Sequence, residues 1–309
     1  MEIMNISNFL FSITDKDCHY VIKFLGIKIK FKHGYKYVCP VVKSSGVTDK
    51  KRSPELIVSL TSFPARINSV EKTIRTLLTQ TLKPDRVILW LAEEQFPNKE
   101  NDLPRALIAL KHFGLEIEFC EDLRSYKKLI PTLKKYPQAV VITTDDDIYY
   151  ASDTVETLYT SYLEDKMSVH AHRVQHTKLV DGDKIKKCGR TPQTSYFNSQ
   201  IGYGAVLYPP DVLYKDVADI SLFKRLLPTH DDVWFWAMTV LNHRKIKVVK
   251  GEKESVIYVE NTQQHGLCKV NKASTKDSSV GISIDEAYKR ILEYYPQILD
   301  VLKEENAEK

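Results

Sequence analysis

Three consecutive aspartates, Asp145, Asp146 and Asp147, follow an apolar run in the stretch AVVITTDDDIYY. Adjacent carboxylates repel each other, so the cluster needs either water around it or a cation between its members. Side chains alternate along an extended chain, so we expect Asp145 and Asp147 on one side and Asp146 on the other. Two carboxylates side by side suit Mg²⁺ or Mn²⁺, which completes its shell with water and substrate phosphates. The alternative is a solvated acidic turn that caps the helix expected at 153–163.

A second acidic pair, Asp231 and Asp232, opens the aromatic stretch HDDVWFW. The pair has a structural explanation, because the dipole of a helix favours negative charge in its first turn. It also has a chemical explanation, because the neighbouring aromatic residues can form an apolar wall that raises the basicity of a carboxylate. A general base that acts on a hydroxyl group requires such a carboxylate.

Small polar groups and one guanidinium follow the first apolar run, in the segment LIVSLTSFPARI: Thr61, Ser62, Pro64 and Arg66. The sequence has no glycine-rich loop of the GxGxxG or GxxxxGKS/T type, which argues against a dinucleotide site or a P-loop. We expect a nucleotide base at this segment with Arg66 near a phosphate, although Arg66 alone is equally typical of a surface residue. Lys128 is a second candidate phosphate partner or a solvated helix lysine. Gly202 and Gly204 mark either a close backbone approach to a ligand or a bulge.

Short apolar runs alternate with helical patterns from Glu55 onward, which is typical of a parallel sheet with helices on both faces. The expected strands occupy 56–60, 86–92, 115–121 and 139–147. Ligands of open α/β sheets bind at the carboxyl ends of the strands, so the TSFPARI segment and the three aspartates are expected at one sheet edge. We therefore predict an α/β fold with a Rossmann-like, mostly parallel central sheet flanked by helices.

The chain is expected to divide into three parts. Residues 1–45 alternate apolar with basic residues, which predicts a small β-hairpin-like extension. Residues 54–280 form the main domain, and a single helix at 283–306 packs on it. The polar positions of the extension are nearly all lysine: Lys23, Lys28, Lys30 and Lys32. These lysines either protect an edge strand from aggregation or form a basic face that rests on anionic lipid.

The composition narrows the function classes. The 309 residues are 43% hydrophobic and carry a net charge of +5, which is ordinary for a globular protein and too mild to predict nucleic-acid binding. The five cysteines are scattered and lack a CxxC pair, which disfavours a disulfide framework or a zinc site. The chain has no apolar run long enough to cross a membrane, and its start lacks the features of a signal peptide. We expect a cytoplasmic protein, on the inner face of the cytoplasmic membrane if the basic segment binds lipid.

Several motifs in this order over residues 54–275 resemble bacterial nucleotide-sugar-dependent glycosyltransferases of the GT-A type, the family-2-like enzymes that build capsule and lipopolysaccharide. The motifs are IVSLTSFPARI, KKLIPTLKKYPQAVVITTDDDIYY, GYGAVLYPP and PTHDDVWFWAMTVL. The resemblance implies a GT-A fold and the transfer of a sugar from a nucleoside-diphosphate donor, with a UDP-sugar expected, to a saccharide or lipid-linked saccharide. It also implies a divalent metal cofactor, Mn²⁺ or Mg²⁺.

The resemblance further implies a metal site. The DxD motif of the family matches Asp145–Asp147, with Asp145 and Asp147 as metal ligands and Asp145 and Asp146 beside the donor. Many of these enzymes add a late histidine to the metal shell. Here the candidate is His265 in QQHGLCK, which is either a ligand or a loop histidine.

The resemblance places donor contacts on Thr61, Ser62, Pro64, Arg66, Lys128 and Gly204. The HDDVW stretch matches the acidic motif of the family, whose second residue, here Asp232, usually serves as the catalytic base. Asp231 stands where glutamate is often found, which leaves open which of the two acids is the base. With such a base the expected reaction is an inverting displacement.

Two other functions stay open. A metal-dependent nucleotidyltransferase or phosphotransferase also uses paired aspartates on an α/β sheet, but nucleotidyltransferases of similar fold usually carry a glycine-rich signature where this chain has TSFPARI. A non-catalytic carbohydrate-binding domain would need neither a metal motif nor an acid pair beside aromatic residues.

Overall fold

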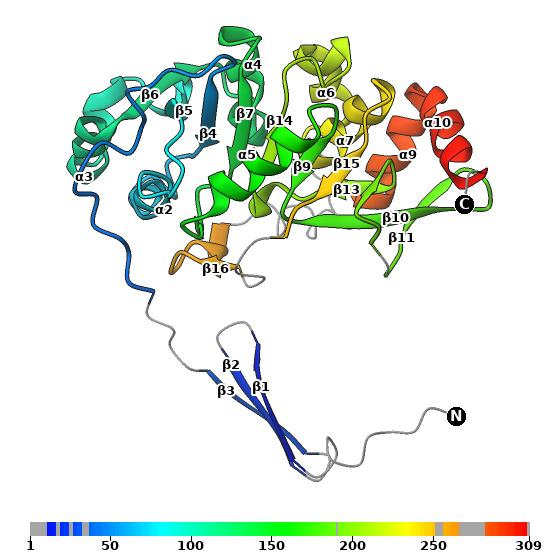
Figure 1. Cartoon of the computed structure of the whole chain (residues 1–309), viewed down its shortest axis with the longest axis horizontal. Helices are drawn as coiled ribbons and strands as arrows, with labels where there is room; N and C mark the ends of the chain where they lie inside the picture. The colour runs from blue at the N-terminus through cyan, green and yellow to red at the C-terminus, as the bar shows by residue number, and fades with distance from the viewer. Residues whose placement is uncertain are drawn as a thin grey trace.

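An eight-stranded sheet forms the centre of the molecule (Figure 1). The computed structural model describes residues 11–16, 19–24, 27–32, 37–189, 191–250, 256–265 and 282–307. The strand order is β12-β15-β9-β14-β7-β4-β5-β6. In chain order these strands are β4 (Leu56–Thr61), β5 (Arg86–Ala92), β6 (Leu115–Cys120), β7 (Val140–Thr144), β9 (Val169–Ala171), β12 (Thr194–Ser195), β14 (Val206–Tyr208) and β15 (Ile246–Val248).

The sheet is mostly parallel, as predicted. Strands β7, β4, β5 and β6 run parallel to one another, and β9 runs parallel to β15. Strands β14 and β12 are the exceptions: β14 lies antiparallel between β7 and β9, and β12 pairs antiparallel with β15. Strands β4, β5 and β7 are mostly apolar and buried, as expected of parallel strands whose two faces are covered. The α/β fold class expected from the sequence is therefore confirmed.

Helices cover both faces of the sheet. The helices are α2 (Val70–Leu77), α3 (Arg105–Ile108), α4 (Ile130–Lys135), α5 (Thr154–Glu164), α6 (Ile220–Leu226), α7 (Asp231–Leu241), α9 (Ile284–Tyr294) and α10 (Gln297–Ala307). Alternate residues of β4 enter two different cores: Leu56, Val58 and Leu60 pack with α2, α3 and α5, whereas Ile57 packs on the side of α6, α7, α9 and α10. The sheet therefore separates two hydrophobic cores.

The fourth predicted strand is shorter than expected. Strand β7 ends at Thr144, and residues 145–147 form a turn that leads into the two-residue strand β8 (Ile148–Tyr149). The predicted continuation of the strand through Asp147 is therefore wrong. The physical reason is that the chain turns here, so that the adjacent Asp146 and Asp147 reach the same partner, Arg66, which alternating side chains of a pleated strand could not do.

The expected single C-terminal helix is two helices. Helix α9 begins after Ser283, whose hydroxyl accepts a hydrogen bond from the Glu286 amide at 3.2 Å, and it ends before Tyr295. Pro296 follows, and a proline has no amide hydrogen and its ring clashes with the preceding helical turn. Helix α10 is attached by Glu305, whose carboxylate accepts hydrogen bonds from the Ser195 hydroxyl at 2.6 Å and the Tyr196 amide at 2.7 Å.

Three smaller sheets complete the described structure. An N-terminal antiparallel sheet contains β1 (Phe11–Lys16), β2 (His19–Phe24) and β3 (Ile27–Lys32), and it lies apart from the central sheet in Figure 1. A second contains β10 (Val174–Val180), β11 (Lys184–Lys187) and β13 (Asn198–Gln200), and a third pairs β8 with β16 (Ile257–Tyr258). Every helix in the described part of the chain is too short or too polar to span a bilayer.

A buried hydrogen-bond cluster connects strands β4 and β5 to helix α4. The hydroxyl of Thr132 accepts a hydrogen bond from the Trp90 indole at 2.7 Å and shares one with the Ser59 hydroxyl at 2.8 Å. Both Thr132 and Ser59 are fully buried, so water cannot replace either bond.

Replacing Thr132 with valine keeps the shape of the side chain and removes the hydrogen-bond partner of the Trp90 indole and of the Ser59 hydroxyl. Because each buried unpaired group is costly, we expect Thr132→Val to lower the free energy of unfolding by roughly 2–4 kcal/mol. Urea unfolding followed by fluorescence measures this. The matched control is Thr160→Val on the exposed side of α5, and equal stability of the two variants would contradict the prediction.

Candidate active site

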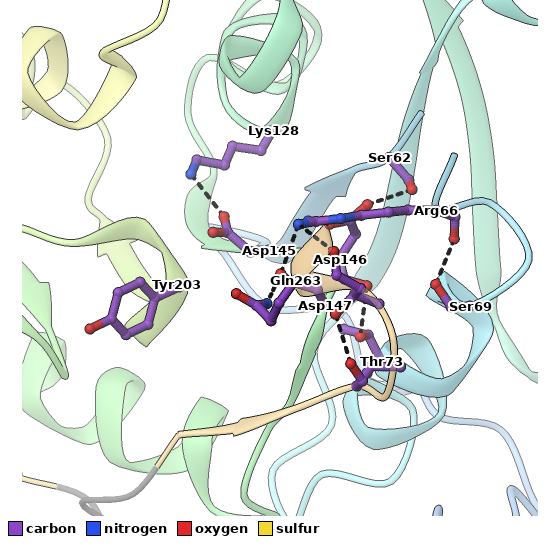
Figure 2. Close-up of polar contacts among 12 residues, drawn as sticks. Ser62, Arg66, Ser69, Thr73, Lys128, Asp145, Asp146, Asp147, Tyr203 and Gln263 are labelled. Carbon is purple, nitrogen blue, oxygen red and sulfur yellow. Dashed lines mark hydrogen bonds and ion pairs between the residues drawn. The ribbon is translucent and has the colours of Figure 1, made fainter. Parts of the chain in front are cut away.

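The turn at 145–147 lies beside the end of β4, where the chain of β4 continues into the TSFPARI segment (Figure 2). Asp146 is buried and faces that segment. Its carboxylate accepts hydrogen bonds from the Ser62 hydroxyl and from Nη1 of Arg66, both at 2.6 Å. Burial raises the pKa of Asp146, and the Arg66 charge and the Ser62 hydrogen bond oppose this shift. The segment and the aspartates thus meet at one sheet edge.

Arg66 bridges two of the three aspartates. Its Nη2 lies 3.0 Å from the Asp147 carboxylate and donates to the Thr262 carbonyl at 3.3 Å. Asp147 also accepts a hydrogen bond from the Gln263 side chain at 2.8 Å. The predicted alternation, with Asp145 and Asp147 facing one way, is wrong in this respect: Asp146 and Asp147 share Arg66 because the chain turns at this point instead of continuing as a strand.

Asp145 has a different partner. Its carboxylate, about one-third exposed, lies 2.9 Å from Nζ of Lys128, and the same ammonium lies 3.0 Å from the Asp231 carboxylate. Asp231 also accepts a hydrogen bond from the Ser125 hydroxyl at 2.8 Å. Ser125 and Lys128 belong to one 3-10 turn, Arg124–Lys128, so a single short segment holds Asp231 and reaches Asp145.

Asp232 is held by a backbone amide. The Gly202 amide approaches both carboxylate oxygens of Asp232, at 3.1 and 3.2 Å. A Cβ atom on Gly202 would lie 2.4 Å from Nζ of Lys128 and 3.0 Å from Oδ1 of Asp232, so a larger residue here would displace the Lys128 ammonium. Desolvation, together with repulsion from Asp231, raises the pKa of Asp232 to about 7.

The aromatic residues after Asp232 belong to the protein core. Trp234, Phe235 and Trp236 are all fully buried. The two indole groups donate hydrogen bonds to the carbonyls of Val217 and Tyr196. The expected apolar wall is therefore the hydrophobic core under α7, and it anchors the first turn of that helix.

The site contains more negative than positive charge. The carboxylates of Asp145, Asp146, Asp147, Asp231 and Asp232 surround two cations, Arg66 and Lys128. Desolvation and repulsion from Asp145 raise the pKa of Asp147 to about 6. An excess of carboxylate oxygens is the donor set that a hard divalent cation requires.

The acidic turn supplies carboxylate oxygens of the kind that a divalent metal binds, together with water and ligand phosphates. Within the described ranges no group of three or more histidine, cysteine, aspartate or glutamate side chains is arranged to hold a metal. His265 ends the 3-10 turn Gln263–His265, but its side chain lies outside the described residues.

The segment 256–265 lies against the acidic turn. The Val259 amide donates to the Asp147 carbonyl at 2.8 Å, and Glu260 pairs with Lys72 at 3.1 Å. Sequence reasoning missed the contributions of Thr262 and Gln263, because nothing in their types or spacing marks them. Ser125 could have been found, since it precedes Lys128 by three residues, one turn of a 3-10 helix.

Three predicted site residues do not contact the acidic groups. The Thr61 hydroxyl donates to the Trp90 carbonyl on β5 at 2.8 Å, and Pro64 is exposed. Gly204 packs against Arg173, and it lines a pocket of about 450 Å³ together with Tyr149, Tyr150 and Tyr203, among others. The Tyr150 hydroxyl accepts a hydrogen bond from the Asp145 amide at 2.8 Å, so this pocket adjoins the acidic turn.

Comparison with known proteins finds distant structural likeness. No protein-family model matches the chain, and no curated protein sequence matches it. A CMP:2-keto-3-deoxy-manno-octonic acid synthetase complexed with CTP aligns with a TM-score of 0.42 and 12% identity, over 71% of this chain and 99% of that one. The mannosyltransferase PcManGT from Pyrobaculum calidifontis, in complex with GDP-Man and Mn²⁺, aligns with a TM-score of 0.43 and 12% identity, over 85% of this chain and 75% of that one. The inositol-1-phosphate CTP transferase from T. maritima aligns with a TM-score of 0.41 and 11% identity, over 79% of this chain and 98% of that one. At these scores the alignments assign no activity to this chain.

The raised pKa of Asp232 has a consequence for stability. The folded state favours the protonated form of the Asp232 carboxyl. The contribution of this carboxyl to stability is therefore fully present below its pKa in the unfolded chain, about 3.8, and is lost as the pH rises through about 7. We expect Asp232→Asn to match the wild type near pH 4 and to exceed its unfolding free energy at pH 8, by on the order of 2–4 kcal/mol.

Chemical denaturation at the two pH values measures this difference. Asp231→Asn is the matched control, because it removes an ion pair with Lys128 and should lower stability at pH 8. A loss of stability at pH 8 in Asp232→Asn would contradict the assigned environment of this carboxyl.

Proposed function

We propose that this chain is a metal-dependent glycosyltransferase that moves a sugar from a nucleoside-diphosphate donor to a saccharide or lipid-linked saccharide acceptor. The supporting observation is the pairing of two acidic groups in one site: a carboxylate pair suited to a metal and, across Lys128, a second acid of raised pKa. The resemblance of the motifs to capsule and lipopolysaccharide enzymes favours a role in surface polysaccharide synthesis with a UDP-sugar donor.

The catalytic base in this proposal is Asp232. Asp231 already pairs with Lys128 and Ser125, whereas Asp232 is held by the Gly202 amide and has a pKa raised to about 7. A base with such a pKa accepts a proton efficiently at neutral pH. The choice between the two acids that the sequence leaves open therefore falls on Asp232.

The reaction is an in-line displacement. The acceptor hydroxyl loses its proton to Asp232 while its oxygen attacks the anomeric carbon, and the bond from that carbon to the diphosphate oxygen breaks. A metal bound by Asp145 and Asp147 supplies positive charge for the departing nucleoside diphosphate. Arg66 holds Asp146 and Asp147 in place for this task. Attack from the side opposite the leaving group inverts the configuration at the anomeric carbon.

The pocket beside the turn is the proposed acceptor site. It is lined by four tyrosines, Tyr37, Tyr149, Tyr150 and Tyr203, and Tyr203 lies one residue from Gly202, which contacts Asp232. Aromatic rings with polar groups around them suit the mixed apolar and hydroxylated faces of a sugar. An acceptor there would place a hydroxyl near the base.

Nucleotidyl transfer is the second candidate. It would use the same acidic turn, and its product besides the activated sugar would be pyrophosphate. The position of Asp232 favours glycosyl transfer, because a base that deprotonates a hydroxyl acceptor is what that reaction needs. Nucleoside diphosphate as the product supports glycosyl transfer, and pyrophosphate supports the second candidate.

Substitutions of Asp145 and of Asp232 should affect nucleotide binding and turnover differently. We expect Asp145→Asn to lose metal-dependent binding of nucleoside diphosphate, because it removes a candidate metal ligand. We expect Asp232→Asn to keep that binding and to lose about 10²- to 10⁴-fold in turnover, because it lacks a base. Calorimetry with UDP and Mn²⁺, with and without chelator, measures binding, and nucleoside-diphosphate release measures turnover. Near-normal turnover in Asp232→Asn together with an inactive Asp145→Asn would contradict the inverting mechanism.

The N-terminal sheet is the proposed membrane contact. The supporting observation lies in the sequence of these strands, where apolar residues alternate with basic ones that include Lys23, Lys28, Lys30 and Lys32. Lysine-rich segments with interspersed apolar residues are typical of elements that lie at the surface of an anionic bilayer.

We therefore expect the protein to sediment with phosphatidylglycerol vesicles and to be released by salt. Replacing Lys23, Lys28, Lys30 and Lys32 with glutamine should weaken binding strongly, since each lysine contributes about 1 kcal/mol. The matched control replaces four exposed lysines of the remaining chain, Lys50, Lys51, Lys83 and Lys166. Equal binding by the two variants would exclude this surface.

A further inference from the structure

Lys128 is a buried lysine at the junction of the two acidic groups. Its side chain is 5% exposed, and it ends the 3-10 turn before α4. The ammonium lies 2.9 Å from the Asp145 carboxylate, as Figure 2 shows, and 3.0 Å from the Asp231 carboxylate. One cation therefore joins the turn after β7 to the first turn of α7, two segments that are more than 80 residues apart in the sequence.

A third acid lies close to the same ammonium. Nζ of Lys128 and Oδ1 of Asp232 both lie near Gly202, since a Cβ on this glycine would come within 2.4 Å of the first and 3.0 Å of the second. Lys128 remains charged in this environment: burial disfavours the ammonium, but the charges of Asp145, Asp231 and Asp232 outweigh it and raise the pKa well above the ordinary value. The positive charge of Lys128 is therefore paired with carboxylates of the protein itself.

We propose that Lys128 is a positioning residue, whose ammonium joins the turn that holds Asp145 to the first turn of α7 through Asp231 and places a positive charge beside Asp232. The roles given to the two acidic groups rest on the proposed function. This assignment differs from the donor contact that the sequence resemblance implies for Lys128, because both short contacts of the ammonium are to protein carboxylates.

The charge balance around Asp232 explains the second half of this role. The titratable groups that interact electrostatically with Asp232 in the described part of the chain include two acids, one lysine and three tyrosines: Asp231, Asp145, Lys128, Tyr126, Tyr208 and Tyr288. The acids and burial oppose ionisation of Asp232, and Lys128 favours it. Without the lysine charge, Asp232 would stay protonated to a higher pH and could not accept a proton near neutrality.

The test is the titration of the Asp232 carboxyl, followed by NMR of protein labelled with carboxyl-¹³C aspartate and assigned with Asp232→Asn. We expect the midpoint in Lys128→Met to rise by at least one pH unit. Ser125→Ala is the matched control, because it removes an uncharged partner of Asp231 from the same turn and should leave the midpoint within half a unit. An unchanged midpoint in Lys128→Met, with weaker binding of UDP and Mn²⁺, would overturn the proposal in favour of a donor contact.

A second variant keeps the proposal testable if Lys128→Met does not fold. Gly202→Ala retains the lysine but displaces its ammonium, which is the flexible end of a side chain. We expect a smaller upward shift of the same midpoint, and no shift would overturn the proposal. The titration needs no substrate, so a failure to find glycosyl transfer in the wild type would refute the proposed function without affecting this result.

Discussion

Five carboxylates that share two buried cations set the conditions for the rest of this site. Arg66 is shared by Asp146 and Asp147, and Lys128 is shared by Asp145 and Asp231. Because the cations are too few to neutralise every acid, burial and repulsion raise the pKa of Asp147 and of Asp232. In the proposed function, that residual negative charge would attract a divalent cation and let Asp232 accept a proton, which are the two requirements of the proposed reaction.

The fold brings these charges together from four places in the chain. Parallel strands β4 and β7 end at the same edge and supply Arg66 and the acidic turn, while the 3-10 turn before α4 supplies Lys128. Helix α7 supplies Asp231 and Asp232, and its aromatic residues fix it in the core beneath the sheet. The antiparallel strand β14 lies next to β7, and the turn that precedes it brings the Gly202 amide to Asp232. The antiparallel insertion thus completes a site that the parallel strands begin.

Sequence reasoning located most of the acidic and basic groups but assigned some of their relations wrongly. The three aspartates and Arg66 could be predicted as site residues because each follows a strand, and the carboxyl ends of parallel strands lie at the same edge of the sheet. The alternation rule failed at Asp146, since it holds only while the chain stays extended and β7 stops one residue before the triplet. Pro296 was visible in the sequence, yet the helix was expected to continue through it; the missing amide hydrogen ends α9 there.

The amino-acid sequence by itself determined the parallel sheet, its order of strands and helices along the chain, and the residue types gathered at its edge, because these follow from local hydrophobic patterns. Only the tertiary structure decided which charge pairs with which. Lys128 meets Asp231 across about a hundred residues, and Gln263 meets Asp147 across a similar separation, so no local spacing encodes either contact. The raised pKa of Asp232 depends on burial and on neighbours that are distant in the sequence, such as Lys128 and Asp145, so it arises only when the chain is folded.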